Sequence, residues 1–231
     1  MKTSIKPQIT KSSIEELVVL VDEQDREIGT ELKSKVHHKN TPLHRAFSLF
    51  LFDHPSDKPS DWLRGKILAT QRAESKKTWP NVWSNSLCGH PSPGESREDG
   101  IVRRVREELG CEIKDLKKVS DYRYRFERDG MVENEICPVY MATIDGEVAP
   151  NSKEVQAWGW FEWQDFLDEL KLDDENKWTE WSKEEAQLVD QYLKTHTLTS
   201  TTKSLSSMAG SVKVKNPISV EKLRDITDYS S

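Results

Sequence analysis

The segment Leu43–Phe52 carries apolar side chains on both faces of an extended chain. Alternation places Phe47, Leu49 and Leu51 on one face and Ala46, Phe50 and Phe52 on the other. Apolar residues on both faces predict a strand that is buried on both sides. Shorter β-rich runs predict further strands at Leu17–Val21, Glu27–Gly29, Lys66–Gln71, Asp121–Phe126, Val132–Met141 and Val155–Phe161. Asp129-Gly130 predicts a hairpin turn between two of them.

The polar and apolar pattern changes to a helical period after a turn that contains Pro91, Pro93 and Gly94. An amphipathic helix is predicted to open at Glu95 and Ser96 and to stop at Gly110, with an apolar face of Ile101, Val102, Val105 and Leu109. One or two helical turns are expected over Glu31–Val36, and helices over Trp163–Leu170 and Lys183–Lys194. Ser182 and Glu185 have the spacing of a capping box for the last of these. Strands and helices mix without regular βαβ alternation, which favours an α/β sandwich with a mixed sheet.

Three regions are expected along the chain of 231 residues: an N-terminal extension over 1–16, a single core over 17–195 and a C-terminal tail over 196–231. No Pro/Gly/Ser-rich linker interrupts the core. Residues 197–212 are mostly small and polar, which predicts a mobile tail, and Ile218–Ile226 is expected to form a short docking helix.

The net charge of −6 argues against a general nucleic-acid binder, which needs a basic surface. Three cysteines without CxxC spacing favour reduced thiols, and no apolar stretch reaches the length of a membrane span. These features favour a cytoplasmic protein. The sequence does not define the oligomeric state, and we favour a monomer.

Five residues have metal-ligand chemistry: His37, His44, His90, Glu133 and Glu135. An isolated histidine is more often a hydrogen-bonded polar residue than a ligand. Glu133 and Glu135, however, are two apart on a predicted strand, so they share a face and repel each other unless a cation or proton separates them. Nitrogen and oxygen ligands in this number suit a divalent ion such as Mn²⁺, Zn²⁺ or Mg²⁺.

The spacing of Gly89, Glu95, Arg103, Glu107, Glu108 and Gly110 resembles the Nudix box. Arg104 stands where a Nudix hydrolase has a glutamate, and Cys88-Gly89-His90 and Glu133-Asn134-Glu135 flank the box. With these features, residues from Leu17 to Trp181 resemble the type 1 isopentenyl-diphosphate delta-isomerases. The resemblance implies the Nudix α/β/α sandwich and interconversion of isopentenyl and dimethylallyl diphosphates.

The resemblance also implies roles for individual residues. The histidines and the Glu133/Glu135 pair would hold a metal, and Glu108 a Mg²⁺ that bridges the diphosphate. The side chains expected around the substrate are Lys33, Arg72, Lys76, Arg104 and Trp181. Cys88 and Glu135 would be the two acid/base groups, without an assignment of donor and acceptor. Tyr124 would assist Glu135, although spacing does not separate it from Tyr122.

Cys88 precedes the predicted helix, a position that is expected to lower the pKa of the thiol. Two other functions are weighed against the isomerase: a Nudix hydrolase of a nucleoside diphosphate derivative, and a Nudix-like binding module without catalysis. Arg104 in place of a box glutamate counts against the hydrolase. The thiol of Cys88 and the Glu133/Glu135 pair count against the binding module, because binding alone does not need them.

Overall fold

The structure is a computed structural model that describes residues 16–53 and 59–209. The chain divides into two compact units, residues 1–194 and 195–231, and the fold described here is that of the first unit. Its strands are β1 (Leu17–Val21), β2 (Glu27–Leu32), β3 (His44–Arg45), β4 (Phe47–Phe52), β5 (Lys66–Arg72), β6 (Trp83–Ser84), β7 (Leu87–Gly89), β8 (Glu112–Ser120), β9 (Arg123–Arg128), β10 (Met131–Ile136), β11 (Val139–Asp145) and β12 (Val155–Glu162). Its helices are α1 (Lys33–Val36), α2 (Pro59–Trp62), α3 (Arg97–Arg104), the π-helical turn η1 (Val105–Leu109), α4 (Trp163–Leu172) and the start of α5 (Glu180–Ala209).

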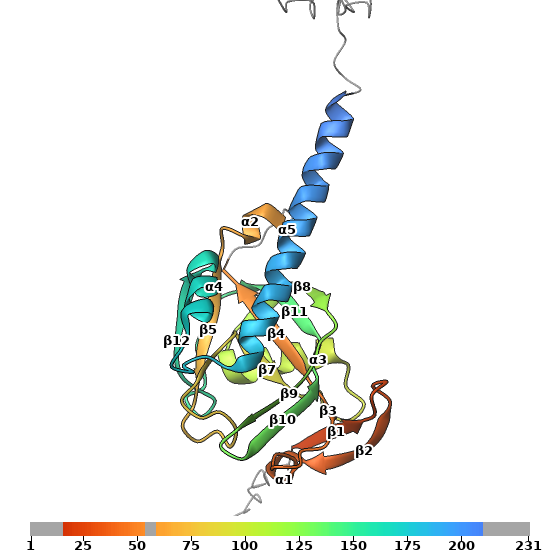
Figure 1. The fold of residues 1–231 in the computed structure, drawn as a ribbon, viewed down its shortest axis with the longest axis vertical. Coiled ribbons are helices and arrows are strands. Elements are labelled where there is room, and N and C mark those ends of the chain that lie inside the picture. The colour runs from red at the N-terminus through yellow and green to blue at the C-terminus, as the bar shows by residue number, and fades with distance from the viewer. Residues whose placement is uncertain (1–15, 54–58, 210–231) are drawn as a thin grey trace, which may run out of the picture. The chain divides into compact units, whose positions relative to one another are not determined.

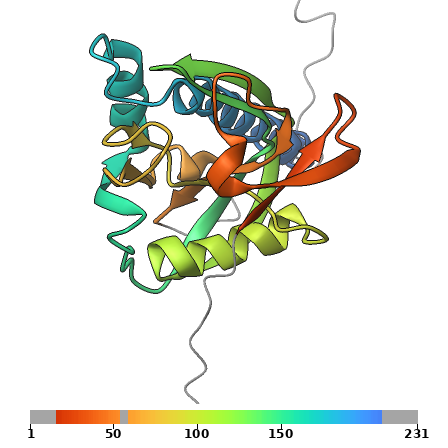
Figure 2. The ribbon, with the colours of Figure 1, turned by 90° about the horizontal axis from the view of Figure 1, so that it is seen from below.

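A seven-stranded sheet contains the predicted doubly buried strand as β4 (Figure 1). Its order is β12-β5-β4-β11-β8, with β6 paired to β5 and β7 to β4, and it is mixed because β4 runs parallel to β11 and antiparallel to β5. Phe50 and Phe52 pack with residues of α4 and α5, whereas Phe47 and Leu49 pack with α3 and η1. Figure 2 shows α3 and the first turns of α5 on opposite sides of this sheet. The predicted α/β class with a mixed sheet is confirmed.

A second sheet of five strands, in the order β2-β1-β3-β10-β9, carries most of the predicted metal ligands. β3 pairs antiparallel with β1 and parallel with β10. β10 pairs antiparallel with β9 across a turn in which Asp129 and Gly130 have φ of 51° and 75°. Positive φ at both positions is what a tight hairpin turn requires, so the predicted hairpin is confirmed.

The predicted amphipathic helix is confirmed as α3 and η1. Ser96 is the N-cap, and its side chain accepts a hydrogen bond from the backbone N–H of Asp99. The final turn is π-helical, because the N–H of Gly110 donates to the carbonyl of Val105, five residues earlier. Gly110 ends the helix with φ of 65°.

Two predicted strands break where the chain passes from one sheet to the other. Leu43–Phe52 divides at Ala46, and Val132–Met141 divides after Ile136, so that β3 and β10 lie in the small sheet and β4 and β11 in the large one. Cys137 and Pro138 separate β10 from β11, and proline lacks the N–H that a continuous ladder needs. The expected helical turns over Glu31–Val36 shorten to α1, because β2 continues to Leu32.

The capping box predicted at Ser182 and Glu185 is wrong. α5 begins at Glu180, and the Ser182 hydroxyl donates to the carbonyl of Thr179. α5 continues to Ala209, past Lys194, where this helix was expected to end. The docking helix expected over Ile218–Ile226 lies outside the described residues. Among the described residues, none of the helices has the length and apolar character needed to cross a membrane.

Candidate metal centre and anion-binding cavity

A cavity of about 100 Å³ brings together most of the residues singled out in the sequence. Its lining consists of Lys33, His37, Arg72, Lys76, Lys77, Thr78, Cys88, Gly89, His90, Arg104, Tyr124, Glu133, Glu135 and Trp181. Glu108 lies in the lining of a smaller cavity of about 20 Å³ that shares Arg72, Lys76 and Cys88 with the first. His44 is fully buried behind the cavity wall, beside Glu135.

The candidate metal centre lies where β3 and β10 pair. Glu135 is the register partner of His44 in the parallel pair β3–β10, so the two side chains meet. His37 follows α1, and His90 follows β7. His37, His44, His90 and Glu135 are all buried, and each offers one ligand atom within 4.8 Å of the others. Glu133 adjoins this group, with Oε2 3.0 Å from Nε2 of His37.

The hydrogen bonding of this group suits a cation. Nδ1 of His44 lies 2.9 Å from the carbonyl of Pro42, which can only accept, so the ring hydrogen is on Nδ1 and Nε2 keeps a free lone pair. Nε2 of His37 and Oε2 of Glu133 are buried 3.0 Å apart, and Nε2 of His44 lies 3.2 Å from Oε1 of Glu135. These contacts do not have hydrogen-bond geometry, so Nε2 of both histidines and Oε2 of Glu133 lack a hydrogen bond. Unpartnered buried polar atoms are costly in a folded protein unless something else binds them. These residues could therefore hold a metal ion.

Two residues of the buried group are in the protonation states that bind metals. Burial lowers the pKa of His90 to about 4, so this imidazole is neutral at neutral pH. Burial acts to raise the pKa of Glu135, but the imidazoles of His44 and His90 outweigh it and hold that pKa well below its usual range. The neutral imidazole of His90 and the ionised carboxylate of Glu135 are ligand forms that a divalent cation needs. The pKa of His44 is raised instead, because burial acts to lower it but the neighbouring Glu135 outweighs that effect, so His44 must lose a proton when it binds a cation.

Glu135 also contacts one of the two candidate tyrosines. The hydroxyl of Tyr124 donates to Oε2 of Glu135 at 2.5 Å, because the two residues are register partners in the pair β9–β10. Tyr122 instead donates to Glu184 at 2.6 Å. Burial, and then the charge of Glu135, raises the pKa of Tyr124, so its hydroxyl stays a donor. The structure thus separates two residues that spacing did not.

The expected lowered pKa of Cys88 is wrong. Cys88 lies on β7, and α3 begins only at Arg97. Burial, and then the nearby carboxyl group of Glu185, raises the pKa of the thiol above its usual value. Cys88 is therefore a protonated thiol in the cavity wall. Cys88, Cys111 and Cys137 are all free.

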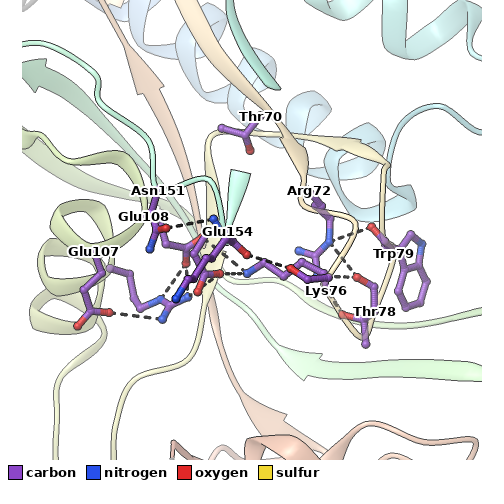
Figure 3. A network of polar contacts seen from close by, with 12 residues as sticks. Thr70, Arg72, Lys76, Thr78, Trp79, Glu107, Glu108, Asn151 and Glu154 are labelled. Atoms are coloured by element: carbon purple, nitrogen blue, oxygen red, sulfur yellow. Dashed lines mark hydrogen bonds and ion pairs between the residues drawn. The ribbon is translucent and has the colours of Figure 1, made fainter. Parts of the chain in front are cut away.

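Three of the predicted cationic residues meet carboxylates in a charged network beside the cavity. Figure 3 shows Lys76, Glu108 and Glu154 of this network. Lys33 forms an ion pair of 2.9 Å with Glu16. Arg104 donates from Nε to Oε1 of Glu108 at 2.8 Å, and its Nη2 also contacts that oxygen. Lys76 contacts Glu154 closely and lies 3.9 Å from Glu108. Side chains of both signs thus converge here, as in a site that binds an anion together with a cation.

Arg72 has a different environment from the other cations. Its guanidinium donates to the carbonyl of Thr78 at 2.8 Å and to the Thr78 hydroxyl at 3.0 Å, which fixes the loop beside the cavity (Figure 3). It also lies 5.8 Å from the ring centroid of Trp181. Trp181 stacks on Tyr124 with centroids 5.8 Å apart, and its indole N–H donates to Ser84 at 3.2 Å. One side of the cavity is therefore an ordered aromatic wall.

Sequence reasoning missed two carboxylates that balance the positive charge of Lys33, Lys76 and Arg104. Glu16 belongs to the segment assigned to the N-terminal extension, yet it pairs with Lys33 and lies 3.7 Å from Arg104. Glu154 pairs with Lys76 and lies 3.7 Å from Arg104. Both residues lie immediately before a predicted strand, which is the only local signal they carry. Their partners are far away in the chain and become neighbours only in the fold.

Comparison with known proteins identifies what the chain resembles. The NUDIX domain family matches residues 42–182. An isopentenyl-diphosphate Delta-isomerase of Mycolicibacterium vanbaalenii is 45% identical over 179 residues, covering 76% of this chain and 92% of the relative. Proteins of the same name from Kocuria rhizophila and Salmonella typhi are each 47% identical, covering 66% of this chain and 81% and 83% of the relatives. A crystal structure from Deinococcus radiodurans shares the fold, with a TM-score of 0.52 and 20% identity, over 68% of this chain and 90% of that one.

Proposed function

The chain belongs to the NUDIX domain family and, within it, to the isopentenyl-diphosphate Delta-isomerases, and from this membership we propose that it interconverts isopentenyl and dimethylallyl diphosphates. The observation that carries the proposal is the joint presence of Cys88 and the Tyr124–Glu135 pair in one cavity beside a cationic network. A 1,3-allylic proton transfer adds a proton at one carbon and removes one at another. Cys88 and Glu135 would flank the substrate and act on these two carbons.

The carbocation formed on protonation of an alkene needs a dry cavity, because water would trap it as an alcohol. Tyr124 and Trp181 are both buried and stack on each other, which supports the exclusion of water from this wall. An indole face stabilises a desolvated cation by about 2 kcal/mol. Trp181 would therefore serve as the wall that faces the cation.

Lys33, Arg72, Lys76 and Arg104 would bind the diphosphate. Glu16 and Glu154 neutralise part of this positive charge, so the diphosphate would take over contacts that these carboxylates make. Glu108 would hold a Mg²⁺ whose charge offsets that of the diphosphate. This arrangement would keep the diphosphate as an anchor rather than as a leaving group.

The ligands His37, His44, His90, Glu133 and Glu135 would hold a Mn²⁺, Zn²⁺ or Mg²⁺ ion, which supplies positive charge that keeps Glu135 ionised. We place the protein in the cytoplasm, because three free cysteines suit a reducing compartment. Its partner in this proposal is a small-molecule diphosphate.

A proton NMR spectrum of isopentenyl diphosphate, incubated with the protein and Mg²⁺, tests the proposal. We expect the allylic methyl signals of dimethylallyl diphosphate to appear, and no phosphate or pyrophosphate release in a parallel colorimetric assay. Substantial phosphate release from a nucleoside diphosphate derivative, without isomerisation, would instead favour a Nudix hydrolase.

A further inference from the structure

Glu185 is a buried acid that the proposed reaction does not use. Its side chain on α5 is completely buried. Oε2 lies 2.5 Å from the Ser48 hydroxyl oxygen, and Oε1 has no hydrogen-bond partner. Burial, and then the negative charges of Glu135 and Glu184, raise its pKa well above the usual value. A buried carboxyl group with acidic neighbours is neutral, since burial and like charges both disfavour the ionised form.

Ser48 links this carboxyl group to Cys88. Ser48 on β4 is the register partner of Cys88 on β7, and the hydroxyl oxygen lies 3.6 Å from the sulfur. The side chain of Asn85 lies between the same strands and is completely buried. Its amide nitrogen donates to Ser48 at 2.8 Å and to the carbonyl of Leu49 at 2.9 Å.

The carbonyl of Leu49 fixes the orientation of the Asn85 amide, because a carbonyl can only accept a hydrogen bond. The amide oxygen of Asn85 therefore faces the other way, where it accepts from Ser84 at 2.9 Å and from the Cys88 thiol at 3.3 Å. The protonated thiol thus has its own acceptor.

The hydrogen positions around Ser48 follow from the same count of donors and acceptors. A neutral Glu185 has one hydrogen to donate. Oε1 has no hydrogen-bond partner, whereas Oε2 lies 2.5 Å from the Ser48 oxygen, so the hydrogen is on Oε2 and is donated to Ser48. Ser48 then accepts from Glu185 and from Asn85. Its own hydrogen is left for the Cys88 sulfur.

We propose that Glu185 and Ser48 are positioning residues for Cys88, in which the carboxyl group of Glu185 directs the Ser48 hydroxyl at the sulfur. The role of Cys88 in this inference rests on the proposed function. Asn85 accepts from the thiol while it carries its hydrogen, and Ser48 donates to the sulfur once that hydrogen has left. The sulfur thus has a partner in both states of a proton-transfer cycle.

The first test compares four variants in steady-state kinetics with isopentenyl diphosphate. A hydrogen bond to a charged group is worth enough to change a rate by about 10- to 100-fold. We expect Ser48→Ala and Glu185→Met to lose kcat by that factor with KM unchanged, because neither residue contacts the cations proposed to bind diphosphate. Glu185→Gln should stay within a few-fold of wild type, because its amide can still donate to Ser48. Ser182→Ala is the matched control, because it removes a different buried hydroxyl, which lies on α5. The Ser182 hydroxyl accepts from the Thr179 hydroxyl and donates to the Thr179 carbonyl.

A normal kcat in Ser48→Ala would overturn the inference, and so would equal losses in Glu185→Gln and Glu185→Met. Equal losses in Ser48→Ala and Ser182→Ala would also overturn it, because they would reflect only a loosened core. Should Ser48→Ala fail to fold, the pair of Glu185 variants decides alone.

A second measurement does not depend on isomerase activity. Iodoacetamide alkylation of Cys88 at a single pH, followed by peptide mass spectrometry with Cys111 as internal reference, should slow about tenfold in Ser48→Ala and Glu185→Met, because the attacking sulfur loses its donor. Glu185→Gln should alkylate like wild type. Unchanged alkylation in all variants contradicts the inference. Absence of isomerisation by the wild type contradicts the proposed function instead, and the alkylation pattern still tests the hydrogen bonds.

Discussion

Glu135 is the residue at which the candidate metal centre and the proposed acid–base pair meet. It lies beside the imidazoles of His44 and His90 on one side and accepts from Tyr124 on the other. Cys88 does not adjoin the metal ligands in this way, because its hydrogen bonds are with Asn85 and Ser48. The two proposed proton-transfer groups should therefore respond differently to removal.

A lost acid or base typically lowers turnover by about 10²- to 10⁴-fold. Cys88→Ala and Glu135→Gln should each reach or exceed the upper end of that range, because either change leaves one proton transfer without a catalyst. Only Glu135→Gln should also lower the metal content, which elemental analysis of the purified variants measures. Cys111→Ala is the control for loss of a buried thiol away from the cavity. Normal turnover and normal deuterium incorporation from D2O in Cys88→Ala would show that Cys88 is only a packed thiol.

His90→Ala should lose bound metal and turnover together, because it removes one of three imidazoles from the buried group and leaves Glu133 and Glu135 with less neutralising charge. His38→Ala is a matched control, since His38 is exposed and lies next to His37 in the chain without joining the group. Chelation of the wild type should mimic His90→Ala, and added Mn²⁺ or Zn²⁺ should restore only the wild type. A full metal complement in His90→Ala would refute the ligand assignment.

At the scale of elements, the sequence predicted the strands and helices that have a clear polar and apolar pattern within their own residues. β4 was predictable because its apolar residues alternate on two buried faces, and α3 because its apolar face has a helical period. β7 was not, because three residues form a strand only when β4 is present to pair with them. β8 was not predicted either, because it is an edge strand whose largely exposed face is rich in charged residues.

The end of the helix pair α3–η1 allows a test of local backbone strain. A Cβ at Gly110 would lie 2.5 Å from the carbonyl oxygen of Ala149, whereas a Cβ at Gly130 would meet nothing within 4 Å. Both glycines have positive φ, so alanine costs about 1–2 kcal/mol at either position. Gly110→Ala should lose more than Gly130→Ala, by about 1–3 kcal/mol for the overpacking, in urea unfolding at equilibrium. Equal midpoints for the two variants would mean that the contact with Ala149 relaxes freely.

At the scale of the whole molecule, the sequence indicated which residue types carry the chemistry but not how they meet. Residue type grouped the three histidines with Glu133 and Glu135, spacing placed the two glutamates on one strand face, and the resemblance supplied the remaining residues. Strand register was needed to choose Tyr124 over Tyr122, since only Tyr124 is paired with Glu135. Charge balance also required the fold, because Lys76 and Glu154 are 78 residues apart.

Every residue placed in the site lies within the unit of residues 1–194, and so do the buried apolar residues of α5 among the side chains that the structure describes, which are Trp181, Ala186, Val189 and Leu193. A chain that ends at Lys194 should therefore keep the metal content, kcat and KM of the full chain within a few-fold. A chain that ends at Gln187 is the matched control, because it lacks Val189 and Leu193, which are 0% and 1% exposed. Loss of each such side chain costs about 2–5 kcal/mol, so this shorter chain should unfold at clearly lower urea concentration. If the chain ending at Lys194 loses turnover while it keeps its unfolding midpoint, residues after 194 contribute to the reaction, and the first unit is not the whole of the enzyme.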